Sequence, residues 1–328
     1  MESIVNPIYQ TLFVMKSKVS LKVPGRICLM GDKVDLLGKP VIGMAINLMM
    51  TINYEERTDE KIEFYSHDTK ERVKFILGES PPKNIDLAYW SVLYERLKHH
   101  IRKGFYIDVS SEIPIGAGLS TSAALSIGFI KALNQALDLG LSNGEIAELA
   151  YLGENHDLGI QCGRLDQYTE VYGGIVFIQT DENPSVEYLD VGSLPIVVGD
   201  SMEDRKASLI LNRVKAQIKK KDSTTLKAFT IIEKCVYEAK DALLQKNYSK
   251  LGKLMDIQQE QERIIKASTE KIDDLCNAAK NAGALGAKQM GAGGGGCIVA
   301  IAPGNQEEVA KAINHAGGRA WIFDIFRY

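Results

Sequence analysis

The alternation of apolar and polar positions divides this chain into short strands and longer helices. Apolar residues that alternate with polar ones, or that run together over a few positions, are typical of strands, whereas apolar residues three and four positions apart predict helices. The predicted strands are residues 19–28, 41–54, 61–66, 72–76, 105–109, 175–179, 194–199, 297–302 and 320–326. The predicted helices are residues 86–101, 122–137, 142–155 and 306–315, with a further helix-rich region over 208–283. Strands and helices mixed in this order predict an α+β fold.

The segment Asp181-Glu-Asn-Pro184 is the best candidate for a linker between two domains. Its polar residues and its proline interrupt the apolar pattern that precedes and follows it. A chain of 328 residues is long enough for two hydrophobic cores. We therefore expect an N-terminal domain over residues 1–184 and a C-terminal domain over residues 185–328.

Composition narrows the class of protein. A hydrophobic content of 45% with 25% charged residues is that of a globular protein, and a net charge of −3 argues against nucleic acid as the main partner. No apolar run reaches the roughly 20 residues that cross a bilayer, and residues 1–18 carry no signal-peptide pattern. The five cysteines are widely spaced, as in reduced cytoplasmic proteins, and the histidines have no metal-ligand spacing. We expect a cytoplasmic protein, monomeric or homodimeric, with no membrane or nucleic-acid partner.

A loop rich in Gly, Ser and Thr, residues 114–122, lies between a predicted strand and a predicted helix. Gly116 and Gly118 let backbone N–H groups turn toward an anion, and the amides at the helix start add positive charge. Neither the G-x-x-x-x-G-K-[ST] nor the G-x-G-x-x-G motif is present, and an ordinary connection between strand and helix is the alternative. The candidate phosphate-binding residues are Pro114, Gly116, Ala117, Gly118, Leu119, Ser120, Thr121 and Ser122, of which the last could also complete a Mg²⁺ shell.

Two other loops combine glycine with polar or closely packed positions. The loop after the first predicted strand contains Asp32, Lys33 and Asp35, whose carboxylates could accept hydrogen bonds from substrate hydroxyls; a polar loop without function is the alternative. The second loop, Gly291-Ala-Gly-Gly-Gly-Gly296, runs into a predicted strand. Four consecutive glycines cost chain entropy, so they indicate a close approach to another surface rather than a flexible linker.

A pair of carboxylates, Glu154 and Asp166, brackets a glycine-rich segment. One lies near a predicted helix end and the other in the turn that follows. The two could serve separate tasks, one holding Mg²⁺ and the other orienting or deprotonating a hydroxyl. By itself this pair is weak evidence, because surface carboxylates are common.

Taken in order, these segments resemble the GHMP kinase superfamily, which is named for galactokinase, homoserine kinase, mevalonate kinase and phosphomevalonate kinase. The resemblance extends from about residue 22 to residue 326 and includes all three superfamily motifs. It implies an N-terminal ATP-binding α/β domain and a C-terminal ferredoxin-like α+β domain, with the active site between them.

The details resemble galactokinase-type sugar kinases most. The matching segments are Pro24-Gly-Arg26, Gly31-Asp-Lys-Val-Asp35, Gly118-Leu-Ser-Thr-Ser122 and Cys162-Gly-Arg-Leu-Asp-Gln167. Three features depart from that pattern: Asp32 replaces a usual Glu, Lys33 replaces a usual His, and no Tyr follows Gly199-Asp-Ser201. The third motif, over residues 291–296, is closer to the mevalonate kinase form.

The resemblance implies a role for each candidate residue. Residues 114–122 would cradle the ATP phosphates, Ser122 and Glu154 would hold Mg²⁺, and Asp166 would accept or orient the proton of the attacking hydroxyl beside Arg26. The substrate-binding candidates are Asp32, Lys33, Asp35, Gly293 and Gly294. We expect an ATP-dependent kinase that phosphorylates a sugar on its anomeric hydroxyl. A mevalonate-type kinase of a small alcohol is the alternative, and an inactive sensor of sugar and ATP is a third possibility.

Overall fold

The computed structural model describes residues 17–82, 87–204 and 206–328. Residues 1–16, which belong to the stretch in which no signal peptide is predicted, therefore lie outside the described residues. The predicted helix start at Asp86 lies outside them as well. The strands are β1 (Lys18–Met30), β2 (Val41–Glu56), β3 (Lys61–Ser66), β4 (Arg72–Ile76), β5 (Phe105–Ser111), β6 (Ile175–Gln179), β7 (Ser185–Tyr188), β8 (Ile196–Asp200), β9 (Gly286–Gln289), β10 (Cys297–Ile301) and β11 (Arg319–Trp321). The helices are α1 (Ala88–Leu97), α2 (Thr121–Leu137), α3 (Asn143–Leu152), α4 (Leu165–Tyr172), α5 (Ala207–Lys219), α6 (Ser223–Leu244), α7 (Tyr248–Ile264), α8 (Glu270–Asn281) and α9 (Gln306–His315), with short turns η1 (Val34–Leu37), η2 (Lys98–His100) and η3 (Gly153–Asp157).

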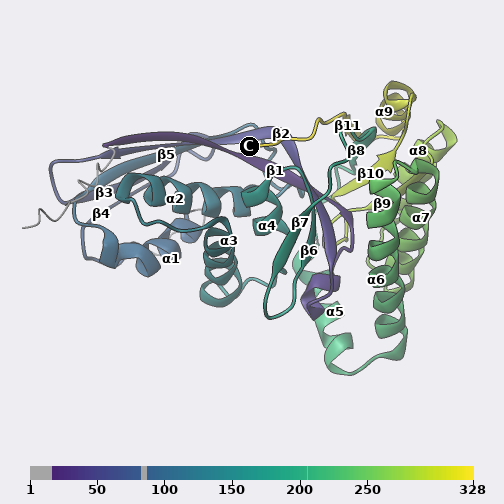
Figure 1. Ribbon diagram of the computed structural model, residues 1–328, viewed down its shortest axis with the longest axis horizontal. Coiled ribbons are helices and arrows are strands. Elements are labelled where there is room, and N and C mark those ends of the chain that lie inside the picture. The colour runs from purple at the N-terminus through teal and green to yellow at the C-terminus, as the bar shows by residue number, and fades with distance from the viewer. Residues whose placement is uncertain (1–16, 83–86, 205) are drawn as a thin grey trace, which may run out of the picture.

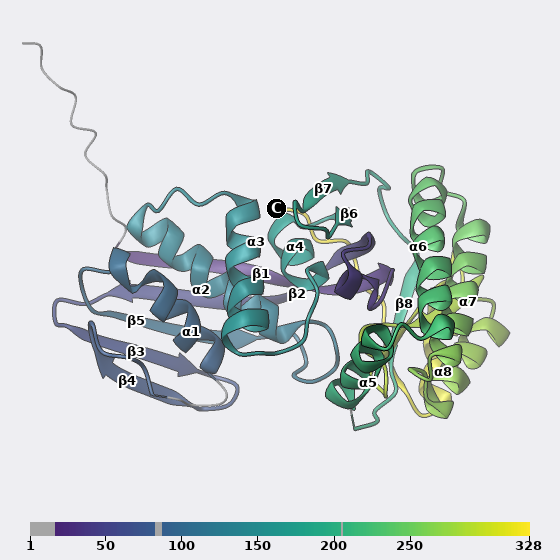
Figure 2. The same cartoon turned by 90° about the horizontal axis from the view of Figure 1, so that it is seen from below.

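The first domain is a mixed sheet with helices on one face. Its strand order is β4-β3-β5-β2-β6-β7, with β1 also paired to β2, and β3 and β5 are the parallel neighbours. Helices α1 to α4 lie against the same face of this sheet (Figures 1 and 2). Aromatic side chains fill the space between the two layers, where Phe64 packs edge-on against both Trp90 and Phe129.

The second domain is a smaller antiparallel sheet covered by long helices. Its order is β11-β8-β10-β9, and α6, α7 and α8 stand beside it (Figure 1). The prediction of two α+β units is confirmed. The first sheet extends past the predicted linker, because β7 pairs with β6 as far as Tyr188. The predicted last strand is shorter than expected and ends at Trp321.

The end of the described chain returns to the first domain. Ile325 forms a bridge with Ile46, and the backbone N–H of Gly174 donates to the carbonyl of Phe326 at 2.7 Å. This crossing places the C-terminal segment beside the start of β6, next to the helix that carries Asp166. Among the helices of the described residues, none has the length and apolarity that a bilayer-spanning segment needs, and no disulfide joins the cysteines.

Candidate active site

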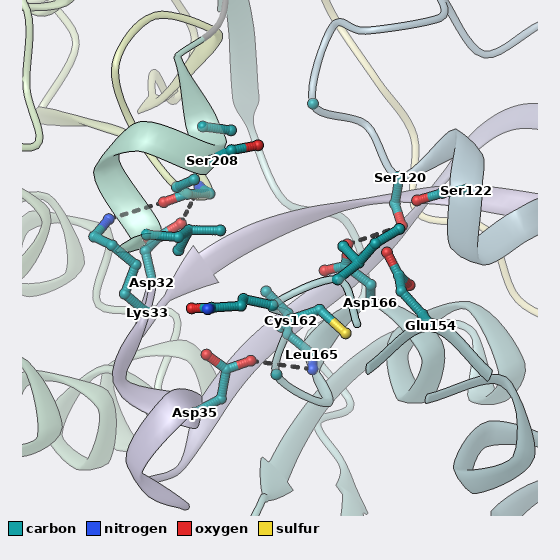
Figure 3. A pocket seen from close by; sticks show the side chains of 18 of the residues that line it. Asp32, Lys33, Asp35, Ser120, Ser122, Glu154, Cys162, Leu165, Asp166 and Ser208 are labelled. Atoms are coloured by element: carbon teal, nitrogen blue, oxygen red, sulfur yellow. Dashed lines mark hydrogen bonds between the residues drawn. The ribbon is translucent and has the colours of Figure 1, made fainter. Parts of the chain in front are cut away.

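A cavity of about 610 Å³ lies between the two domains and gathers most of the predicted site residues. Figure 3 shows Ser120, Ser122, Glu154 and Asp166 on one side of this cavity, and Asp32, Lys33 and Asp35 on the other. The remaining walls come from the loop 159–163, from the start of α5 and from Gly291 and Ala292. Segments that are far apart in the sequence thus meet at one site.

The phosphate loop leads directly into α2. Gly116 and Gly118 have φ values of 80° and 88°, in the left-handed region that favours glycine. These two residues line the cavity together with Ser120, Thr121 and Ser122. The other predicted members, Pro114, Ala117 and Leu119, do not line it: Ala117 and Leu119 are buried, and the Pro114 carbonyl accepts a hydrogen bond from Ala117 N. The loop therefore offers glycines, hydroxyls and a helix N-terminus to an anion.

Arg26 and Asp166 form a two-pronged ion pair at the base of the cavity. The Arg26 Nε–H donates to Asp166 Oδ1 at 2.6 Å, and a second guanidinium N–H donates to Oδ2. Another N–H of the same group donates to the carbonyl of Gly118 at 2.7 Å, which ties the pair to the phosphate loop. Burial alone would lower the pKa of Arg26, but the charge and hydrogen bonds of Asp166 raise it. Ser120 Oγ also donates to Asp166 Oδ2, at 3.0 Å.

Glu154 is a buried carboxylate that opens onto the same cavity. Burial, followed by repulsion from Asp166, raises the pKa of Glu154 to about 7. Its Oε2 accepts a hydrogen bond from Gln167 at 2.8 Å, and the Ser122 hydroxyl lies beside it. A desolvated carboxylate and a hydroxyl fit the hard oxygen ligands that Mg²⁺ requires. In the described ranges no cluster of three or more Asp, Glu, His or Cys surrounds the position, so phosphate oxygens and water would complete the shell.

Asp35 lies in η1 and lines the cavity on the side opposite to Asp166 (Figure 3). Burial, followed by repulsion from Asp166, raises the pKa of Asp35 to about 6. Its Oδ2 accepts a long hydrogen bond of 3.4 Å from the Leu165 backbone, and no ion pair to Asp35 occurs within the described residues. Gly163 makes room for this carboxylate, since a Cβ there would lie 1.8 Å from Asp35 Oδ2. Asp35 is thus the carboxylate left with capacity to bind a ligand.

The side chains of Asp32 and Lys33 both form ion pairs with residues of the second domain. Asp32 forms a fully buried ion pair with Lys288 and accepts hydrogen bonds from Gln258 and from the backbone of Gly291. Lys33 Nζ lies 2.8 Å from Glu262 Oε2, and both of these side chains are buried. These partners hold the first loop against the third, so a direct contact of Asp32 or Lys33 with substrate remains only a prediction.

The glycine run divides into two parts. Gly291 and Ala292 line the cavity, whereas Gly293 and Gly294 pack against other segments of the second domain. A Cβ on Gly293 would lie 2.3 Å from the carbonyl of Ala267. The close approach expected from the sequence occurs within the protein, and substrate contact by Gly293 and Gly294 is not part of this geometry.

Some site residues were missed by the sequence analysis. Ser208 and Asn212 of α5 line the cavity, and Cys162 lies beside Asp35 and Leu165 (Figure 3). Lys288 lies three residues before the glycine run 291–296, where a lone cation was a usable signal. Glu262 carried no signal, because its role depends on a partner far away in the sequence.

Comparison with known proteins identifies the chain. Residues 86–174 match the model of the GHMP kinases N terminal domain, and residues 239–319 match that of the GHMP kinases C terminal domain. Mevalonate kinase of Pyrococcus furiosus is 33% identical over 94% of this chain and 97% of its own length. The chain belongs to the GHMP kinases. Galactokinase of the same organism is 28% identical over 93% of the chain and 94% of its own length.

Solved structures agree on the fold of this GHMP kinase. Lactococcus lactis galactokinase complexed with galactose superposes with a TM-score of 0.83, at 22% identity, over 95% of each chain. The predicted two-domain GHMP kinase fold is confirmed, and with it a phosphotransferase that uses ATP and a hydroxyl acceptor on a small molecule.

Proposed function

We propose that this GHMP kinase transfers the γ-phosphoryl group of ATP, with Mg²⁺, to a hydroxyl of a sugar in the cytoplasm, the anomeric hydroxyl being the expected acceptor. The observation that carries this proposal is Asp35, a carboxylate across the cavity from Asp166 that has no cationic partner in the described residues. Carboxylates accept hydrogen bonds from neighbouring hydroxyls, which a sugar offers in pairs. The side of the cavity that carries Asp35, called the acceptor wall below, is therefore suited to a neutral polyhydroxy compound.

The charge balance of the cavity supports the same acceptor class. Its described lining contains two cations, Arg26 and Lys33, and each is already in an ion pair. An acceptor with its own carboxylate would meet Asp35 and Asp166 without an uncommitted positive charge among these residues. Burying such an unpaired anion is costly.

In the proposed mechanism, positioning and charge stabilisation do most of the work. Asp166 accepts the proton of the attacking hydroxyl as the new oxygen–phosphorus bond forms; the bond between the γ-phosphorus and the bridging oxygen breaks, and ADP leaves with that oxygen. Arg26 orients Asp166 through their two-pronged ion pair, and it stabilises charge on the transferring group. Ser122 and Glu154 would hold Mg²⁺, which neutralises charge on the phosphates. Asp35 orients the acceptor through its other hydroxyls.

A mevalonate-type reaction is the second candidate, and the curated relatives favour it. Relatives with 33% identity are named mevalonate kinase, against 28% for the galactokinase, and the glycine run over 291–296 also resembles the mevalonate kinase form. Both candidates use the same base, phosphate loop and metal ligands, so they differ only in the acceptor.

One panel separates the two candidates. ADP release is measured with neutral monosaccharides, heptoses, uronic acids and mevalonate, and ³¹P NMR identifies the phosphorylated hydroxyl. Turnover of a sugar with an anomeric phosphate supports the proposal. Turnover of mevalonate alone rejects the sugar assignment in favour of the second candidate, and turnover of no compound in the panel rejects both.

A further inference from the structure

Glu170 is a buried carboxyl beneath the catalytic pair for which the mechanism has no use. It follows Asp166 by four positions on α4, so both side chains lie on one face of the helix. Its side chain is inaccessible to solvent, and neither carboxyl oxygen has a hydrogen-bond partner at normal distance within the described residues. An orphaned polar group of this kind in a core demands an explanation.

The titratable groups that face Glu170 come from several elements, including the C-terminal segment, whose Tyr328 hydroxyl donates to the Glu170 backbone carbonyl at 2.8 Å. Arg26 on β1 is the nearest favourable charge, but its N–H groups are directed to Asp166 and Gly118. Asp166 and Glu154 are repulsive, and Lys131 on α2 approaches without forming an ion pair. Burial lowers the pKa of Lys131 to about 8, so this amine loses its charge as pH rises through that value. Burial raises the pKa of Glu170 well above its ordinary value, which favours the protonated carboxyl.

Ser120 connects this neutral carboxyl to the base. Its hydroxyl donates to Asp166 Oδ2 at 3.0 Å and also interacts with the Glu170 carboxyl. Ser120 has a φ of 71°, a conformation in which glycine is preferred. Serine in place of glycine at such a position adds a hydroxyl that the backbone conformation does not itself require. A hydroxyl can accept one hydrogen bond while donating another, which a protonated carboxyl allows here.

We propose that Glu170 is a positioning residue: a protonated carboxyl that donates to Ser120 Oγ and so fixes the hydroxyl that Ser120 directs to Asp166. The chain runs from the Glu170 O–H to the Ser120 O–H to Asp166 Oδ2. It leaves the remaining lone pairs of Asp166 for Arg26, which donates to both carboxylate oxygens, and for the acceptor. A neutral Glu170 also does not compete with Asp166 for Arg26. This role rests on the proposed function of Asp166 as the base.

Three variants and a control test the role of Glu170. Glu170→Leu removes the donor, and Glu170→Gln retains a neutral donor of similar size. Ser120→Ala removes the intermediate hydroxyl while keeping the Cβ. Val171→Ala, one position further along α4 and also buried, serves as the control for loosening the helix. Thermal unfolding of each variant verifies that it is folded.

The expected result is a loss of about five- to tenfold in kcat for Glu170→Leu, with KM for ATP unchanged, as for one lost hydrogen bond. Glu170→Gln should keep at least half of the wild-type kcat. The Ser120→Ala, Glu170→Leu double variant should lose no more than Ser120→Ala alone, because both changes break one chain. Equal losses in Glu170→Leu and Val171→Ala, equal losses in Glu170→Gln and Glu170→Leu, or additive losses in the double variant would each overturn the proposal.

A spectroscopic measurement separates this proposal from the choice of acceptor. The infrared difference spectrum between wild type and Glu170→Gln, recorded at neutral pH without substrate, should contain the carbonyl stretch of a protonated carboxyl. A carboxylate band instead would overturn the role of Glu170 whatever the enzyme phosphorylates. Conversely, a protonated Glu170 in a protein that turns over no acceptor would indicate failure of the proposed function alone.

Discussion

Replacing Gly163 by alanine should damage acceptor binding while leaving the ATP side intact. The added Cβ would lie 1.8 Å from Asp35 Oδ2, whereas ordinary van der Waals contact begins at 3.4 Å, so the carboxylate must move by about 1.6 Å. The backbone of Gly163 is not in the left-handed region, so alanine fits its conformation. The perturbation is thus confined to the position of Asp35.

The size of the effect follows from that displacement. A misplacement of about 1 Å in an active site can cost about 10²-fold in rate. We expect kcat/KM for the acceptor to fall by about 10²-fold, mostly through KM, and KM for ATP to change less than twofold. Initial rates of ADP release at varied acceptor and varied ATP measure both constants.

Gly144→Ala is the matched control, because Gly144 lies within α3 and the nearest atom to its new Cβ is Tyr172 Oη at 3.6 Å. This variant should keep wild-type kinetics and gain up to about 1 kcal/mol in the free energy of unfolding. If Gly163→Ala kept kcat/KM for the acceptor within threefold of wild type, Asp35 would not be an acceptor-binding residue. The charge argument for a sugar would then lose its main support.

Four further changes test the remaining assignments. Asp166→Asn should lower kcat by about 10²–10⁴-fold with little effect on ATP affinity, and retention of more than a tenth of kcat would reject its role as base. Glu154→Gln should raise the Mg²⁺ concentration for half-maximal rate, as a Mg²⁺ titration would detect. Because the pKa of Asp35 is raised to about 6, its ionised form increases with pH through that value, so KM for the acceptor should fall between pH 5 and 7 in wild type but not in Asp35→Asn. Asp32→Asn should lower the free energy of unfolding by about 3–5 kcal/mol, since it leaves Lys288 buried without its partner. The charge of Lys288 lowers the pKa of Asp32 against the effect of burial, so the contribution of this pair is present above the unfolded pKa and is lost as pH falls through the folded one; denaturant titrations at several pH values would measure it.

The sequence predicted those strands and helices that are determined by neighbouring residues in the chain. The strands 61–66 and 72–76 have the bounds that alternation predicted, and Ser142 forms the expected capping box with Glu145. Helix α4 was missed because it has eight residues between glycines and buries polar side chains such as Gln167 and Glu170. A buried polar residue breaks the apolar period on which a helix prediction depends.

The residues of the candidate site also divide into those that local motifs predicted and those that only the folded structure brings together. The phosphate loop, Glu154 and Asp166 were recognisable because the order of the motifs implies their roles, and the structure brings them to one cavity. The partners of Asp32 and Lys33 could not be found in this way. Asp32 and Lys288 are 256 positions apart, and only the docking of the two domains brings them together.

The docking of the two domains explains why resemblance of the motifs alone did not identify the acceptor substrate. The first motif resembles galactokinases and the third resembles mevalonate kinases. The charged residues of the first motif, Asp32 and Lys33, form ion pairs with Lys288 and Glu262 across the domain boundary. Residues at matching motif positions can therefore hold the domains together instead of contacting substrate. What remains to discriminate acceptors is the charge that this network does not neutralise, and on the acceptor wall that charge is Asp35. We therefore expect substrate choice in this GHMP kinase to depend on a carboxylate that Gly163 leaves room for, rather than on the most recognisable positions of the motifs.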